Sequence, residues 1–123
     1  MAELESGLQR RCQAVLKKKK AFVIKTHGDI YGRVGIPDLI GCLPIEKDRL
    51  LELMNEDWFK SGKIGLFVSF EIKRENHLKD VSKAQEIVGK EIKDAGGLWF
   101  AIDDSELLEY LLDKLRGEQD VIQ

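Results

Sequence analysis

The sequence has no long apolar run, little proline and few cysteines, and each absence excludes a class of protein. No apolar stretch approaches the roughly 18 residues that suggest a membrane-spanning helix, so no membrane partner is expected. The first residues lack the basic and apolar regions of a signal peptide. With only 2 prolines and 11 glycines among 123 residues, the chain is neither collagen-like nor low in complexity. Cys12 and Cys42 do not have C-x-x-C spacing. We therefore expect both to be reduced thiols, as in a cytoplasmic protein. We expect one soluble domain over residues 1–123.

Charge is distributed unevenly along the chain. The net charge is −2, which argues against a strongly basic nucleic-acid binder. Residues 1–34 nevertheless hold eight Lys or Arg against three Asp or Glu, and residues 104–123 hold two against six. The four lysines Lys17–Lys20 either contact phosphates or form a solvated helix end, where cations also suit the helix dipole. The basic first third permits a surface that faces a polyanion.

Hydrophobic periodicity predicts an α/β layered domain. Helices are expected at about residues 2–18, 82–95 and 105–115, strands at 21–26, 36–43, 63–73 and 98–102, and a polar inserted helical segment at 44–62. The first helix gathers its apolar residues on one arc, which we expect to face the core. Gly96 and Gly97 are expected to end the third helix through a left-handed cap.

Four charged residues interrupt these patterns. Glu5 falls within the apolar arc of the first helix, and Asp38 lies in an apolar strand. Glu71 and Lys73 are two apart on the strongest strand, so that both side chains lie on one face. Each has an ordinary structural explanation: an acid in the first helical turn, a Pro-Asp turn, or a solvent-facing ion pair. Glu91 also points into the apolar arc of its helix, and the sequence offers no reason for it.

Together these residues suit the hydrolysis of a phosphodiester. That reaction needs hard oxygen ligands for Mg²⁺, an activated water and a cation near the developing negative charge. Asp38, Glu71 and the backbone carbonyl of Ile72 would supply oxygen ligands, and Glu5 would add another carboxylate. Lys73 would position or deprotonate the water, or stabilise the charge on the phosphate.

The order of these residues resembles the signature of the PD-(D/E)xK nucleases and, more fully, that of their virus-type replication-repair branch, the VRR-NUC domain. The matching residues are Glu5, the run Gly35-Ile36-Pro37-Asp38-Leu39-Ile40-Gly41, the run Phe70-Glu71-Ile72-Lys73, Ser82 with Gln85, and Gly96-Gly97 before a short strand. The resemblance spans residues 3–103. It implies a restriction-endonuclease-like core, in which helices flank a mixed central β-sheet in the order α-β-β-[insert]-β-α-β-α.

The resemblance also implies a site and a reaction. It makes Asp38 and Glu71 ligands of Mg²⁺ or Mn²⁺, Lys73 the catalytic lysine, Glu5 the helix-borne acid and Gln85 the glutamine beside the site. Ser82 and Gln85 are equally a helix capping box, and both roles stay open. The 32 residues between Asp38 and Glu71 are accounted for by the insertion at 44–62.

We therefore expect a metal-dependent DNA endonuclease that is selective for branched, Holliday-junction-like DNA and serves phage or repair recombination in a bacterial or phage-infected cell. The alternative is a non-catalytic nucleic-acid-binding or assembly module that retains the nuclease fold. A homodimer is expected, because a 14.0 kDa domain is small for holding a junction and two-fold symmetry supplies two sites. The apolar residues of the insertion (Leu50, Met54, Trp58 and Phe59) and the leucine-rich last helix offer such an interface.

Overall fold

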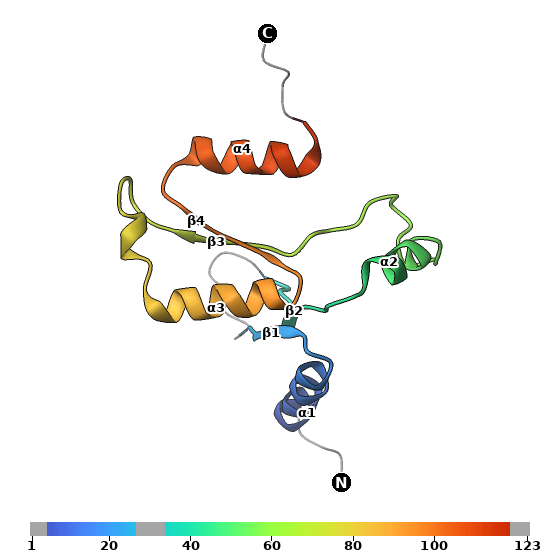
Figure 1. Cartoon of the computed structure of the whole chain (residues 1–123). Coiled ribbons are helices and arrows are strands. Elements are labelled where there is room, and N and C mark those ends of the chain that lie inside the picture. Colours follow the sequence, from blue (N-terminus) through green and yellow to red (C-terminus); the bar gives the residue numbers. More distant parts are fainter. Residues whose placement is uncertain (1–4, 27–33, 119–123) are drawn as a thin grey trace.

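A computed structural model describes residues 5–26 and 34–118 of the chain, and these residues form a mixed α/β structure (Figure 1). The elements in chain order are α1 (Glu5–Lys18), β1 (Phe22–Lys25), β2 (Leu39–Cys42), α2 (Lys47–Leu53), β3 (Val68–Ile72), a short 3-10 turn (Leu78–Asp80), α3 (Lys83–Asp94), β4 (Leu98–Ile102) and α4 (Ser105–Arg116). This is the predicted order of elements. None of the helices in the described ranges has the length and apolar character needed to cross a membrane.

The strands form two separate two-stranded sheets in the described part of the chain, whereas the resemblance to VRR-NUC nucleases implies one central mixed sheet. β1 and β2 pair antiparallel, with Phe22 opposite Cys42 and Lys25 opposite Leu39. β3 and β4 pair parallel through the crossover helix α3. Figure 1 shows the β3–β4 sheet between α4 above and α3 below. We call these three layers the body, and we call α1 with the β1–β2 hairpin the arm.

The body shows the strongest agreement with local sequence signals. Ser82 caps α3 through a complete capping box with Gln85. The helix ends before Gly96, whose φ of 91° is the left-handed conformation that glycine adopts most easily. β4 occupies the predicted residues 98–102, and α4 begins after the capping side chain of Asp104. These predictions are confirmed.

Two predicted strands are shorter in the structure. The segment predicted at 36–43 pairs only over β2, because Pro37 has no N–H for the ladder and so lies outside the strand. The segment predicted at 63–73 pairs only over β3, since β4 provides five partner residues. Asp38 therefore lies directly before β2, whereas the sequence predicted that it lies within the strand.

The insertion at 44–62 is helical only in α2. Its N-cap, Glu46, makes no side-chain hydrogen bond to the first turn, and turns that include Gly62 at φ 75° follow the helix. Trp58 on these turns is 79% exposed. The prediction of a helix with a core-facing side across the whole insertion is wrong beyond Leu53.

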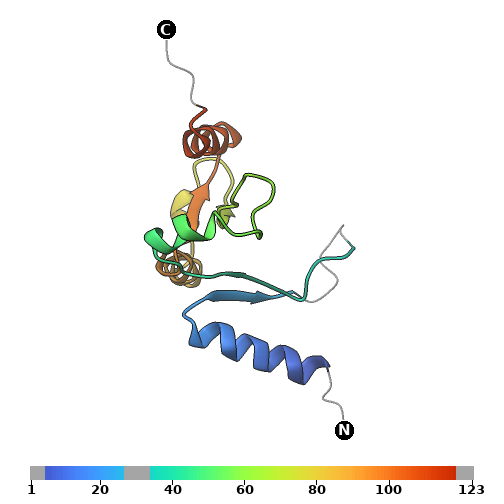
Figure 2. The same ribbon diagram turned by 90° about the vertical axis from the view of Figure 1, so that its right-hand side faces the viewer.

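The arm is attached to the body at one end. The rings of Phe22 and Phe67 meet edge to face at 5.9 Å, and the Cys42 thiol donates to the carbonyl of Ala95 at 3.4 Å. From this junction the hairpin extends away from α3, with α1 alongside it (Figure 2). Of the apolar arc of α1, Leu8, Cys12 and Val15 are exposed and Leu16 is half-buried, while Leu4 lies outside the described residues, so the prediction that the arc faces the core of this chain is wrong for most of its described residues. The buried apolar core of the described residues is small: Cys42, Leu53, Ile92, Ala95 and Ile102.

Candidate active site

Glu71, Lys73 and Gln85 form a cluster on the α3 side of the β3–β4 sheet. The Gln85 side-chain amide donates to Oε1 of Glu71 at 2.7 Å, and Lys73 Nζ lies 3.6 Å from the same oxygen. Both contacts are made to Oε1, so Oε2 remains able to coordinate a cation. The structure therefore brings together three of the five side chains predicted for the site.

The pleat of β3 turns the charged residues toward the protein and an apolar residue toward solvent. The side chains of Glu71 and Lys73 are only 28% and 20% exposed, while Ile72 between them is 63% exposed. On an ordinary surface strand, an acid and an amine would face the solvent. Here they lie on the sheltered face, so this pair is not an ordinary surface ion pair. Partial burial strengthens their electrostatic interaction and reduces its screening by salt.

Lys73 follows the last residue of β3 and is held by the sheet. Its backbone N–H donates to the carbonyl of Ile102 at 2.9 Å, which extends the parallel ladder by one residue. The Ile72 carbonyl, the predicted backbone ligand, lies between the two charged residues at this strand end. The ammonium and the carboxylate are thus positioned by backbone pairing and not by loop conformation.

Gln85 serves both the helix and the site. Its side-chain oxygen accepts from the Ser82 N–H at 2.8 Å, and its own N–H donates to the Ser82 hydroxyl at 3.1 Å. Its amide nitrogen remains free to donate to Glu71. The two roles left open by the S-x-x-Q spacing are therefore compatible, because they use different atoms of one side chain.

Asp38 and Glu5 lie on the arm. Asp38 is exposed, and its backbone carbonyl accepts from the N–H of Thr26 at 3.0 Å, next to the hydroxyl bond from Thr26 to Pro37. Asp38 therefore closes the hairpin at the end away from the Phe22–Cys42 junction. Glu5 is an exposed residue in the first turn of α1. Neither acid has a hydrogen bond or ion pair with Glu71 in the described structure.

The donor atoms suit a hard cation only in part. Carboxylate and carbonyl oxygens are the preferred ligands of Mg²⁺ and Mn²⁺. Within residues 5–26 and 34–118, however, no three His, Cys, Asp or Glu side chains lie together in a way that could hold a metal ion. Glu71 offers one carboxylate oxygen without a protein contact among the described residues, and the other two acids predicted for the site, Asp38 and Glu5, lie on the arm.

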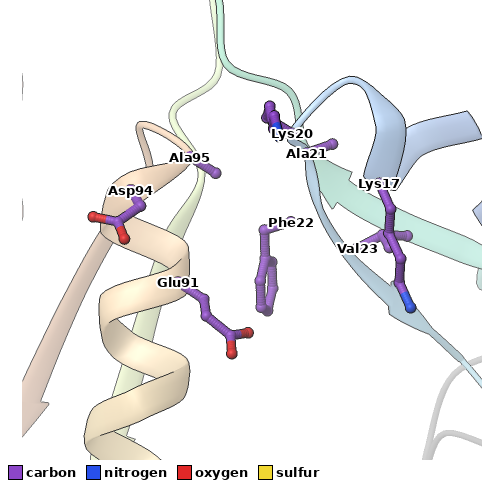
Figure 3. Close-up of a pocket in the computed structure, with 8 residues that line it drawn as sticks. All are labelled: Lys17, Lys20, Ala21, Phe22, Val23, Glu91, Asp94 and Ala95. Atoms are coloured by element: carbon purple, nitrogen blue, oxygen red, sulfur yellow. The ribbon is translucent and has the colours of Figure 1, made fainter. Parts of the chain in front are cut away.

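An open pocket of about 540 Å³ lies between the arm and α3, and the sequence did not predict it. The residues around it are Lys17, Lys20, Ala21, Phe22, Val23, Glu91, Asp94 and Ala95 (Figure 3). In Figure 3 the Glu91 side chain extends from α3 toward the Phe22 ring. The apolar arc in which Glu91 stands therefore borders this pocket, and Glu91 is exposed. In the sequence, the feature that pointed to this pocket was Glu91, an acid within the apolar arc of its helix.

Comparison of the chain with protein-family models, with curated proteins and with solved structures finds no match. The interpretation of the cluster consequently depends on its own chemistry.

Proposed function

We propose that this protein is a Mg²⁺- or Mn²⁺-dependent endonuclease that hydrolyses phosphodiester bonds of branched DNA. The observation that carries the proposal is the Glu71–Lys73–Gln85 cluster, in which a carboxylate, an ammonium and an amide share one sheltered face. These three groups, at this spacing in the sequence, are those that the resemblance to VRR-NUC nucleases implies. The restriction-endonuclease-like core is part of the same proposal.

Hydrolysis of a phosphodiester forms one P–O bond to water and breaks one P–O ester bond. The water loses a proton, and the departing sugar oxygen gains one. A bound divalent cation supplies Lewis-acid polarisation of the scissile phosphate. Glu71 Oε2 and the Ile72 carbonyl would hold this cation from the body, and Asp38 and Glu5 are the acids that the arm would supply.

Lys73 acts on the reacting atoms. Its ammonium lies beside Glu71 and is positioned by the ladder bond to Ile102, so it can orient the attacking water and stabilise negative charge that develops on the phosphate. Gln85 donates to Oε1 of Glu71, which would leave Oε2 available to hold the cation. Gln85 is therefore a positioning residue, whereas Lys73 is a catalytic residue.

One observation favours the alternative of a non-catalytic module that binds nucleic acid. The three acids of the predicted site do not form one group in the described residues of a single chain. A protein of this alternative kind binds DNA through the basic first third of the chain and leaves the DNA intact, with or without metal.

A cleavage assay separates the two functions. The purified protein is incubated with labelled four-way junction, linear duplex and single-stranded DNA, each with Mg²⁺, Mn²⁺ or EDTA, while a gel shift in EDTA measures binding. We expect cleavage of the junction with either metal and no cleavage in EDTA. Binding without cleavage under every metal condition would refute the nuclease and support the non-catalytic module.

A further inference from the structure

The open pocket between the arm and α3 has the size of a ligand site. Its volume of about 540 Å³ falls within the range of roughly 300–1,000 Å³ that small-molecule sites occupy. The arm provides Lys17, Lys20 and the half-buried Phe22, and α3 provides Glu91. An apolar surface with a few charged groups around it is the usual composition of such a site. The cleavage reaction proposed above uses none of these residues.

The charged side chains around the pocket do not pair across it. Asp94, which also borders the pocket, is paired with Lys90 of its own helix at 2.8 Å. Among the residues that the structure describes, Lys17, Lys20 and Glu91 form no ion pair. Figure 3 shows Glu91 on the α3 side of the pocket and Lys17 on the side of the arm. The pocket therefore offers two ammonium groups from one side and one unpaired carboxylate from the other.

The end of α1 holds Lys20 at the pocket in an unusual backbone conformation. Its φ is 66°, in the left-handed region that glycine usually occupies after a helix. The N–H of Ala21 donates to the carbonyl of Leu16 at 3.1 Å, and the N–H of Lys20 donates to that of Lys17 at 3.0 Å. These two bonds are those of a Schellman cap. Strained residues of this kind gather at functional sites, and here the strain adds a second cation to the pocket.

The Phe22 ring provides the apolar surface of the pocket. It makes an edge-to-face contact with the ring of Phe67, with 5.9 Å between the centroids and 65° between the planes. The ring lies between β1 and α3, and the side chain of Glu91 extends toward it (Figure 3). Aromatic side chains that are held in place in this way are platforms on which unpaired bases stack.

These groups fit an unpaired nucleotide better than two other kinds of ligand. A DNA duplex presents mainly phosphates, which Glu91 would repel. A basic side chain of a protein partner would suit Glu91, but Lys17 and Lys20 would repel it. An unpaired nucleotide suits every group, because its phosphate is an anion, its base is a flat ring and the edge of its base carries N–H donors.

The carboxylate of Glu91 distinguishes between the bases. An ionised carboxylate accepts hydrogen bonds and donates none. Guanine presents two neighbouring donors, its N1–H and its amino group, which match the two oxygens of one carboxylate. Cytosine and adenine present an amino group alone, and thymine presents only its N3–H. Charge-assisted bonds formed in pairs are the strongest, so guanine is the base that suits this pocket best and thymine the one that suits it least.

We propose that this pocket binds an unpaired guanine nucleotide of a DNA strand. The base stacks on Phe22 and donates to Glu91, and the phosphate lies between Lys17 and Lys20. Binding of the nucleotide is independent of the nuclease, whereas its use to hold an unpaired base at a DNA branch rests on the proposed function. Gln85 of the cluster is six residues before Glu91 on α3, a rise of about 9 Å, so one strand can reach both places.

Fluorescence anisotropy in EDTA tests the pocket without cleavage. The probes are labelled single strands of thymidine whose central nucleotide carries guanine, adenine, cytosine or thymine. We expect the wild-type protein to bind the guanine strand at least about tenfold more tightly than the all-thymine strand, with the other two between them. Glu91→Gln should lose most of this preference. Glu86→Gln, the same change on an exposed residue of α3 away from the pocket, should keep it.

The salt dependence of binding tests the phosphate contact. Lys17→Gln should weaken the binding of every strand and reduce the slope of log K against log salt by about 0.7, the value for one phosphate of a single strand. Lys18→Gln removes the same charge from an exposed neighbour that does not border the pocket, and it should leave the slope unchanged. Circular dichroism verifies that each variant is folded.

The wild-type protein alone can refute the proposal. Equal affinity for all four strands would overturn it. So would a preference for guanine that persists in folded Glu91→Gln or that Glu86→Gln also removes, and equal slopes for the two lysine variants would overturn the phosphate contact. A protein that prefers guanine but cuts no DNA would refute only the nuclease. A protein that cuts junctions but binds all four strands equally would refute only the pocket.

Discussion

Gln85→Glu separates the two roles of Gln85, since it changes one atom of the side chain. The new carboxylate still accepts from the Ser82 N–H and so preserves the cap of α3. It can no longer donate to Glu71, and it places a second negative charge 2.7 Å from Oε1 in the wild-type geometry. We therefore expect the effect of the substitution to fall on the site, with little effect on the helix.

The expected loss of stability follows from these contacts. The hydrogen bond from Gln85 to the charged Glu71 contributes about 1.5–3 kcal/mol to the free energy of unfolding, and the substitution removes it. A new acid near a helix N-terminus stabilises the helix by about 0.3–1 kcal/mol, which offsets part of this loss. Because the Glu71 side chain is 28% exposed, water screens part of the repulsion. The net destabilisation is about 1–2 kcal/mol, which lowers Tm by about 4–8 °C in a domain of this size.

Urea unfolding followed by circular dichroism measures this loss, and the junction-cleavage assay measures its consequence. Ser82→Ala is the matched control: it removes the hydroxyl cap at a cost of about 1 kcal/mol but keeps the backbone N–H that holds Gln85. Cleavage should fall strongly in Gln85→Glu and persist in Ser82→Ala. If both variants lose stability equally and both cleave normally, Gln85 is only a capping residue and our reasoning is refuted.

Three further predictions follow from individual contacts. Lys73→Met should still bind Mn²⁺ by isothermal titration but lose at least about 100-fold in cleavage rate, and lost metal binding with retained cleavage would reverse its assigned role. Gly89→Ala should destabilise the fold by about 1–3 kcal/mol in urea, since its Cβ would lie 2.6 Å from the Trp99 ring; unchanged stability would contradict this packing. Burial raises the pKa of the Cys42 thiol, so at pH 8 it holds less thiolate and should react with iodoacetamide more slowly in the folded protein than in urea. Equal rates in both states would show that Cys42 is accessible.

The elements that could be predicted from the sequence are those with local signals at both ends. α3 begins at a capping box and ends before Gly96, whose conformation needs no tertiary contact to be favoured. The strand at 36–43 was predicted too long, because the apolar run begins at Ile36, before Pro37, while pairing depends on a partner strand. Strand length is thus a tertiary property, which a single run of residues does not contain.

The candidate site was predictable for a similar reason. Glu71 and Lys73 share a face through the two-residue period of β3, and Gln85 is oriented by its own helix start, so local geometry brings the three together. The position of Asp38 depends on where the hairpin packs. Periodicity showed that α1 has an apolar side, but it did not show which surface covers that side.

The central claim is tested most directly by Glu71→Gln in the cleavage assay with Mn²⁺. The substitution preserves size and removes the charge that binds the cation. Glu75→Gln, an exposed acid four residues along, makes the same chemical change away from the cluster. We predict that folded Glu71→Gln loses at least about 100-fold in cleavage rate while Glu75→Gln cleaves like the wild type. Full cleavage by folded Glu71→Gln would contradict the account.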